Sequence, residues 1–191
     1  MIYTRKRTDT HNRILNAAIE LLAEIGYDNL TITRIAETAD VGRGTVYQYF
    51  GDKEGLVLQI FQRYYEQIED EANLRMLEYE SPLREIIAWQ TTFEHLARIK
   101  PIFRQINSPG AQILWQRFEN YAQQHFRVSL ERGLFLYPQW MNLPADVMAT
   151  FTSGAVLSVM RRWLSEELSY DPPELARMVH QLLYHAPDRR A

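Results

Sequence analysis

Cysteine is absent from the 191 residues of this sequence. Its absence excludes a disulfide scaffold, a cysteine-ligated zinc or iron–sulfur site and a thiol nucleophile. No run approaches the roughly 18 consecutive apolar residues that a membrane-spanning helix needs. The basic first residues are not followed by the apolar segment typical of a secretory signal. We therefore expect a cytoplasmic protein that does not enter the membrane.

Neither sign of charge is in large excess. Lys and Arg total 21 and Asp and Glu total 24, which gives a formal net charge of −3. This balance does not by itself indicate a nucleic-acid or membrane binder. Hydrophobic residues make up 46% and charged residues 24%, close to an ordinary globular protein. The length fits one or two domains with a substantial core.

The N-terminal third shows a pattern of one long and two short helices. Apolar residues at helical spacing predict an amphipathic helix over residues 10–25, with Gly26 as its C-cap. Two short helices are predicted over 31–38 and 43–49, and Gly51 ends the second of them. Two short helices joined by a tight turn are typical of a helix-turn-helix.

The rest of the chain is also helical, and β signals are nearly absent. A long helix is expected from Asp52 to about Tyr79, with an aromatic packed loop over residues 134–143. Prolines mark the starts of four further helices, over residues 82–100, 108–133, 144–168 and from 172 onward. The sequence predicts an all-α fold with a three-helix helix-turn-helix domain over residues 1–52 and a helical bundle over 53–191.

The second short helix presents two chemically different faces. Val46 and Phe50 are four residues apart and are expected to face the core. Its other face is polar and comprises Arg43, Gly44, Thr45, Tyr47 and Gln48. Arginine pairs with guanine and glutamine with adenine in the major groove, so this face suits DNA. An ordinary helical hairpin with a polar face is the alternative, and spacing alone does not choose between them.

Charge gives little support to DNA binding. Residues 1–55 hold seven Lys and Arg against eight Asp and Glu, an unusual balance for a DNA-binding unit. The exception is the start of the chain, where Arg5, Lys6 and Arg7 form a basic arm suited to phosphates or the minor groove. A solvated, disordered tail is an equally good interpretation of this segment.

Residues 30–56, LTITRIAETADVGRGTVYQYFGDKEGL, resemble the signature of the TetR family of transcriptional repressors. The resemblance includes the preceding amphipathic helix with Gly26 and Tyr27, whereas the remaining two-thirds match only in size, helicity and helix order. Asp40 stands where the family usually has Gly, and Asp tolerates a left-handed backbone better than most residues. Gly42 and Gln48 replace a frequent Ser and a frequent His. A DNA sequence preference therefore cannot be copied from a relative.

The resemblance implies roles for eight residues on and around the two short helices. Thr31 caps the first of them and faces phosphate together with Thr33, and Lys53 binds a phosphate from the start of the next helix. Bases or their neighbouring phosphates are contacted by Arg43, Gly44, Thr45, Tyr47 and Gln48.

The resemblance also implies a ligand pocket enclosed by the central helices, where binding shifts the DNA-binding units apart. We expect a small hydrophobic or aromatic inducer to contact Trp89, Phe93, Trp115, Phe118 and Tyr121. The alternative is that these side chains simply form the bundle core. Glu94 and Arg98, one helical turn apart, either orient a polar ligand or form a surface pair.

The last two helices are expected to form a homodimer interface, as the resemblance implies. The expected contact residues are Phe151, Ala155, Val159, Trp163, Leu175, Met178, Val179 and Leu182. A twofold dimer presents two recognition helices to successive major grooves, so the double-stranded operator should be palindromic. A buried core within one chain is the alternative interpretation of these residues.

Enzyme signatures are missing. None of the five histidines follows a Glu by three residues, as a di-iron bundle requires. Nucleophile-elbow, phosphate-loop and dinucleotide motifs are absent as well. We expect no enzyme, cofactor or metal, but a dimeric repressor released by a small inducer. The alternatives are a ligand-independent DNA-binding protein of the same fold that responds to a protein partner, and a pure interaction bundle.

Overall fold

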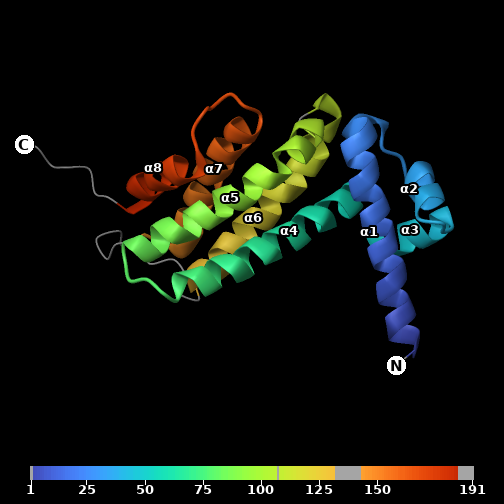
Figure 1. The fold of residues 1–191 in the computed structure, drawn as a ribbon, viewed down its shortest axis with the longest axis horizontal. Coiled ribbons are helices and arrows are strands. Elements are labelled where there is room, and N and C mark those ends of the chain that lie inside the picture. The colour runs from blue at the N-terminus through green and yellow to red at the C-terminus, as the bar shows by residue number, and fades with distance from the viewer. Residues whose placement is uncertain (1, 107, 132–142, 185–191) are drawn as a thin grey trace, which may run out of the picture. The chain divides into compact units, whose positions relative to one another are not determined.

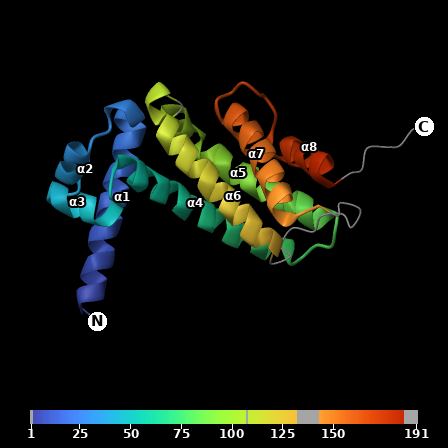
Figure 2. The same cartoon turned by 180° about the vertical axis from the view of Figure 1, so that it is seen from behind.

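The computed structural model of the chain describes residues 2–106, 108–131 and 143–184. These residues form eight α-helices and one short 3-10 turn, and they contain no strand (Figures 1 and 2). The predicted all-α fold is confirmed. None of the described helices is long and apolar enough to cross a membrane. The described residues also contain no cluster of side chains suited to a metal ion.

The chain divides into two compact units that each combine distant segments. The first, here called the head unit, comprises Met1–Glu66 and Pro101–Arg117. The second, here called the bundle unit, comprises Gln67–Lys100 and Phe118–Ala191. The helix-turn-helix therefore shares a compact unit with residues well beyond the division predicted at residue 52.

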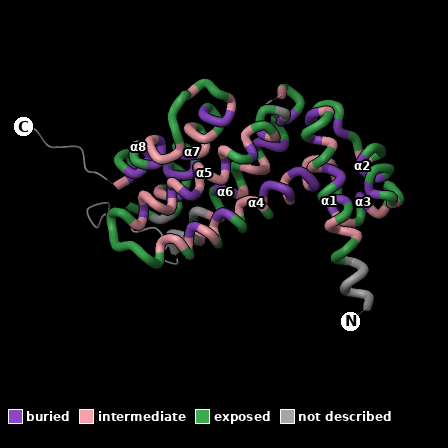
Figure 3. Tube along the Cα trace, in the orientation of Figure 1, coloured by how far each residue is buried: buried purple, intermediate pink, exposed green. Residues whose placement is uncertain are grey.

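In the head unit, α1 spans Ile2–Asn29 and begins earlier than the predicted start at residue 10. The basic arm thus continues α1 as a helix. Gly26 has φ 74° and interrupts the helical path where the sequence predicted the C-cap. The inner face of α1 is buried as expected, with Ile14 and Leu22 fully enclosed (Figure 3).

The two short helices lie as predicted, with α2 over Ile32–Thr38 and α3 over Arg43–Phe50. Thr31 caps α2, and its Oγ1 accepts a hydrogen bond from the amide of Arg34 at 3.3 Å. Asp40 in the turn has φ 51°, the left-handed conformation that its position demands. Gly51 has φ 76° and ends α3.

The long helix α4 spans Lys53–Met76. Asp52 caps it as predicted, because its Oδ1 accepts from the amide of Gly55 at 2.6 Å. A Cβ on Gly55 would collide with the carbonyl oxygen of Phe50, so the backbone approaches closely at this corner. The corner between α3 and α4 therefore requires glycine at position 55.

The helix α5 spans Leu83–Ile106 and passes through Pro101. The prediction that Pro101 would end this helix is wrong. Proline removes one helical hydrogen bond, but Phe103 and Ile106 beyond it are buried, which favours continuation. The head unit resumes at Pro101, and its 3-10 turn Pro109–Ala111 then leads into α6.

Three helices complete the chain: α6 over Gln112–Glu131, α7 over Ala145–Leu164 and α8 over Pro172–Tyr184. The helix α7 ends before the predicted residue 168, because Glu166 takes a left-handed backbone. α7 and α8 lie side by side in both views (Figures 1 and 2). Apart from Leu143, the predicted loop over residues 134–143 lies outside the described residues.

Candidate DNA-binding and ligand-binding sites

The recognition helix α3 has the two faces that the sequence predicted. Val46 is fully buried and Phe50 is 7% exposed. Tyr47, by contrast, is 53% exposed. Arg43, Gly44 and Gln48 are also exposed, and Thr45 is half-buried. The predicted orientation of α3 is confirmed, and its contacts with DNA stay a prediction.

Arg13 of α1 holds the turn that precedes α3. Its Nη2 donates to the carbonyl oxygens of Ala39 at 2.5 Å and Asp40 at 3.0 Å. The same nitrogen lies 3.6 Å from the Asp40 carboxylate. Arg13 thus satisfies carbonyls at the end of α2 and fixes the left-handed turn. It belongs to the internal bonding of the head unit, a role that sequence reasoning missed.

His11 connects three helices of the head unit. Its Nε2 lies 2.9 Å from Oε1 of Gln59 in α4. Its ring stacks on Phe50 at 5.0 Å and meets Tyr49 edge-on at 5.9 Å, both in α3. The end of the recognition helix is therefore packed from α1.

Lys53 has a second role besides the predicted phosphate contact. Its Nζ donates to the carbonyl oxygen of Tyr27 at 3.2 Å and lies 4.0 Å from the centre of that ring. The Tyr27 hydroxyl donates to Oε1 of Glu54 at 2.8 Å. Burial first, and then the carboxylate of Glu54, raises the pKa of the Tyr27 phenol well above its ordinary value. The end of α1 is thereby tied to the start of α4.

A bidentate ion pair joins α6 to the corner between α3 and α4. Nη1 and Nη2 of Arg117 lie 2.7 and 2.8 Å from the two carboxylate oxygens of Asp52. The hydrogen bond from Arg117 lowers the pKa of Asp52, and Asp52 raises the pKa of Arg117 in return. Ser108 likewise donates to Asp28 of α1 at 2.8 Å. These bonds hold residues 108–117 to the helix-turn-helix within the head unit.

The remaining predicted DNA contacts lie at the start of α2 and in the first turns of α1. Thr31 and Thr33 are exposed, and the Thr31 side chain also serves as the cap of α2. Arg5, Lys6 and Arg7 belong to α1, and their side chains lie outside the described part of the chain.

Two of the predicted ligand contacts form an aromatic cluster in the bundle unit. Trp89 is 4% exposed and Phe93 is fully buried, and their ring centres lie 6.3 Å apart on α5. Trp163 of α7 meets Phe93 edge-on at 5.6 Å. Trp163, predicted as a dimer contact, is therefore part of this cluster within one chain.

The other three predicted ligand contacts lie on α6. Trp115 lies in the head unit, where its ring centre is 6.0 Å from that of Phe103. Phe118 and Tyr121 are half-buried on α6 in the bundle unit, and Tyr121 lies 5.9 Å from the ring of His125. The five aromatic residues thus divide between the two compact units.

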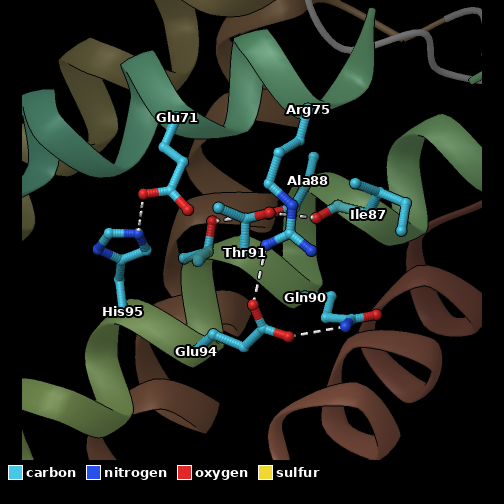
Figure 4. A network of polar contacts seen from close by, with 9 residues as sticks. Glu71, Arg75, Ile87, Ala88, Gln90, Thr91, Glu94 and His95 are labelled. Atoms are coloured by element: carbon cyan, nitrogen blue, oxygen red, sulfur yellow. Dashed lines mark hydrogen bonds and ion pairs between the residues drawn. The ribbon is translucent and has the colours of Figure 1, made fainter. Parts of the chain in front are cut away.

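Polar contacts join α4 to α5 in the bundle unit (Figure 4). His95 Nε2 lies 2.6 Å from Glu71, and Arg75 donates to Glu94 at 2.8 Å. Glu94 also accepts from Gln90 at 2.7 Å. Burial raises the pKa of Glu94, but the hydrogen bonds from Gln90 and Arg75 outweigh it and leave the pKa below its usual value. Glu94 thus accepts hydrogen bonds from Arg75 and Gln90, whereas its predicted partner Arg98 lowers its pKa through charge alone.

The predicted dimer contacts separate by burial. Trp163, Leu175 and Val179 are no more than 4% exposed within the single chain. Phe151 and Leu182, by contrast, are 70% and 76% exposed. Ala155 is also exposed, and Val159 and Met178 are intermediate. The first three residues are therefore inaccessible to a partner. The accessible ones are Phe151, Leu182, Ala155, Val159 and Met178.

Comparison with known proteins identifies both parts of the chain. Residues 14–60 match the model of bacterial regulatory proteins of the tetR family, and residues 88–185 match a transcriptional regulator C-terminal region. The chain belongs to the TetR family. Its helix-turn-helix is thus a DNA-binding element of a transcriptional regulator.

Individual relatives are similar to this chain over most of its length. The HTH-type transcriptional repressor AcnR of Corynebacterium glutamicum is 26% identical over 151 residues, which cover 76% of this chain and 77% of that protein. Thermus thermophilus FadR, solved with lauroyl-CoA, has a TM-score of 0.65 at 20% identity and covers 95% of this chain and 98% of its own. RolR, solved with resorcinol, has a TM-score of 0.58 at 24% identity. The match covers 95% of this chain and 91% of the RolR chain.

The TetR-family signature explains which residues sequence reasoning singled out and which it missed. It pointed to α3 and its cap because those residues lie in one continuous stretch. Arg13 and Arg117 are outside that stretch and act on it from α1 and α6. The one available signal was Asp40, because a left-handed residue other than Gly benefits from a partner that fixes the turn.

Proposed function

We propose that this TetR-family chain is a dimeric repressor that binds a palindromic operator and is released by a small hydrophobic or aromatic ligand. The exposed polar face of α3 carries the proposal, because it is presented on a buried apolar base formed by Val46 and Phe50. Arg13 and Arg117 further fix the segments before and after this helix. In this proposal, the protein acts in the cytoplasm by binding DNA and a ligand, not by catalysis.

Exposed apolar residues on α7 and α8 support the dimer. Phe151 and Leu182 are large, apolar and mostly exposed. A side chain added at Gly154 on α7 would meet no atom within 4 Å, so another helix has room to approach there. A pair of such helices from each chain would make a four-helix interface. Twofold symmetry then implies a palindromic operator.

The aromatic cluster on α5 supports a ligand-responsive bundle unit. Trp89 and Phe93 provide a buried apolar surface. FadR was solved with lauroyl-CoA and RolR with resorcinol, so proteins of this fold accept ligands that have an apolar or aromatic part. A ligand that prefers the non-binding conformation by about 1–3 kcal/mol would release most of the operator.

A ligand-independent regulator that responds to a protein partner is the second candidate. The close packing of Phe93 against Trp89 and Trp163 favours it, since these rings also serve as an ordinary core. A thermal-shift screen with a metabolite and drug panel separates the two candidates. A stabilising compound that also releases DNA supports the first, and stabilisation by none supports the second.

Fluorescence anisotropy with DNA from the intergenic region beside the gene tests the DNA-binding claim. We expect Arg43→Ala and Tyr47→Ala each to weaken binding by about 1–3 kcal/mol, or roughly tenfold or more. Arg98→Ala is the matched control, because Arg98 is exposed on α5. Equal binding by all three variants and the wild type would reject α3 as the recognition helix.

A further inference from the structure

Glu85 is a buried acid in the first turn of α5. The residue is only 7% exposed. Its Oε1 accepts a hydrogen bond from the Ser81 hydroxyl at 2.5 Å and lies 3.7 Å from Nη2 of Arg84. Its Oε2 is enclosed and has no hydrogen-bond partner among the residues that the structure describes. One oxygen of this carboxylate is thus bonded to Ser81, and the other is buried without a donor among the described residues.

The structural role of Glu85 accounts for one oxygen only. An acid in the first turn of a helix interacts favourably with the helix dipole, and the bond from Ser81 fixes the entry of the chain into α5. A glutamine would keep the bond from Ser81 without burying a charge. A buried acceptor without a donor is unfavourable. The unpaired Oε2 therefore points to a donor that the described residues do not supply.

Glu85 shares one face of α5 with the aromatic cluster. Trp89 and Phe93 follow it at intervals of four residues, so the three side chains project from the same side of the helix. The cluster already accommodates a cation elsewhere, since Nζ of Lys100 lies 4.7 Å from the Trp163 ring centre. A carboxylate beside aromatic rings is the combination that binds an organic cation.

Exposed apolar side chains precede Glu85 in the sequence. Leu77 and Tyr79 in the connection from α4 are 82% and 38% exposed, and Leu83 at the start of α5 is 46% exposed. This segment offers an apolar surface next to the first turn of α5. These side chains offer a favourable surface to a ligand with an apolar body.

We propose that Glu85 Oε2 accepts a hydrogen bond from the protonated amine of an apolar or aromatic effector, whose body packs against Trp89 and Phe93. The proposal rests on the ligand response proposed above and specifies its chemistry. A carboxylate at this position repels an anionic group, so a carboxylate or acyl phosphate effector is disfavoured at this end of the bundle unit. The favoured ligand differs in charge from the acyl-CoA bound by FadR.

Three naphthalene probes of equal shape test the proposal by isothermal titration of the full chain. They are 1-naphthylmethylamine, the neutral 1-naphthylmethanol and the anionic 1-naphthoate. We expect the amine to bind at least about tenfold more tightly than either of the others. Glu85→Gln should remove this preference while leaving the alcohol unaffected. Glu78→Gln, which removes an exposed acid from the connection before α5, should change nothing.

Several results would overturn the proposal. One is that the amine does not bind at about 1 mM. Another is that Glu85→Gln leaves the affinity for the amine unchanged. The third is that Glu78→Gln lowers the affinity for the amine as much as Glu85→Gln does. The melting temperature of the ligand-free Glu85→Gln variant supplies an independent measurement. We expect it to equal or exceed that of the wild type, because a buried charge is removed. A clear decrease would assign Glu85 a purely structural role.

Anisotropy with the neighbouring DNA, measured on the same samples, keeps the two proposals apart. If DNA binds with sequence preference and the amine does not bind, the effector assignment fails and the regulator stands. If the amine binds through Glu85 and no DNA binds, the operator proposal fails and the ligand site stands.

Discussion

At the scale of single residues, the turn before the recognition helix depends on Arg13. Asp40 has φ 51°, a conformation that is unfavourable for most residues other than glycine. Arg13 offsets this by bonding two carbonyls of the turn. Arg13 therefore helps to position α3 through these bonds.

Replacing Arg13 tests this positioning role. Arg13→Ala should lower the free energy of unfolding by about 1 kcal/mol, because it leaves carbonyls at the end of α2 without a protein donor. Arg13→Lys keeps the positive charge but lacks the planar guanidinium with its several donors. It should therefore recover only part of the lost stability. Urea unfolding gives the stability. Equal stability of all three proteins would show that the turn holds its shape without this side chain.

The ion pair of Asp52 with Arg117 predicts a pH dependence. The folded-state pKa of Asp52 is lowered, chiefly by the hydrogen bond from Arg117. Its stabilisation is therefore complete above the unfolded pKa of about 4 and is lost as pH falls through the folded value. Since both side chains are partly exposed, with 39% and 45% accessible, the effect is at most about 1 kcal/mol.

Asp52→Asn provides the comparison, because asparagine caps a helix well and carries no charge. We expect the wild type to melt about 2–4 °C higher near neutral pH, and the gap to close as the pH falls below the unfolded pKa of about 4. A gap that is the same at neutral and acid pH would mean that the charge of Asp52 contributes nothing.

At the scale of elements, Gly44 within α3 and Gly55 near the start of α4 have opposite environments. A Cβ at Gly44 would meet no atom within 4 Å, whereas one at Gly55 would collide with the Phe50 carbonyl oxygen. Gly44 lies inside a helix, where alanine is more favourable by about 1 kcal/mol. Gly55 lies at the corner that sets the exit from α3.

Alanine at these two positions should act in opposite directions on stability. Gly44→Ala should stabilise the protein by up to about 1 kcal/mol and still weaken DNA binding, because the added methyl group lies on the face proposed to enter the groove. Gly55→Ala should destabilise by about 1–3 kcal/mol. Thermal unfolding and anisotropy measure the two effects. If Gly44→Ala leaves DNA affinity unchanged, residue 44 does not approach DNA closely.

The sequence predicted most elements because their boundaries carry local chemistry. Thr31, Asp52 and Gly51 mark ends of helices through caps or positive φ, and each does so in the structure. The prediction at Pro101 was wrong because the helix continues where the residues after the proline are buried. The local sequence pattern does not show that burial.

The candidate sites were less predictable for the same reason. The exposed face of α3 follows from a helical repeat. Whether Trp163 faces a partner or the core of its own chain depends on Phe93, seventy residues earlier in the sequence. Trp115 and Trp89 looked equivalent as aromatic residues, yet they belong to different compact units. Long-range packing, not composition, separates these cases.

At the scale of the whole molecule, the account requires a dimer. Phe151→Asp combined with Leu182→Asp should yield a folded monomer, since both side chains are mostly exposed in the single chain. Operator affinity should fall at least about tenfold when the second half-site contact is lost. Sedimentation gives the mass and circular dichroism the helix content.

Leu74→Asp is the matched control for the dimer. Leu74 is 67% exposed on α4, so its replacement adds a comparable charge to a different surface. A dimer that persists in the double variant, or is lost equally in the control, would place the interface elsewhere.

Binding of the wild-type chain to the intergenic DNA beside its gene tests the central claim most directly. Anisotropy is measured at two salt concentrations against scrambled DNA of the same length. The account predicts saturable binding of one dimer that is tighter than to the scrambled DNA at both concentrations, with affinity falling as salt rises. Equal affinity for both sequences, or no salt-sensitive binding to either, would contradict it.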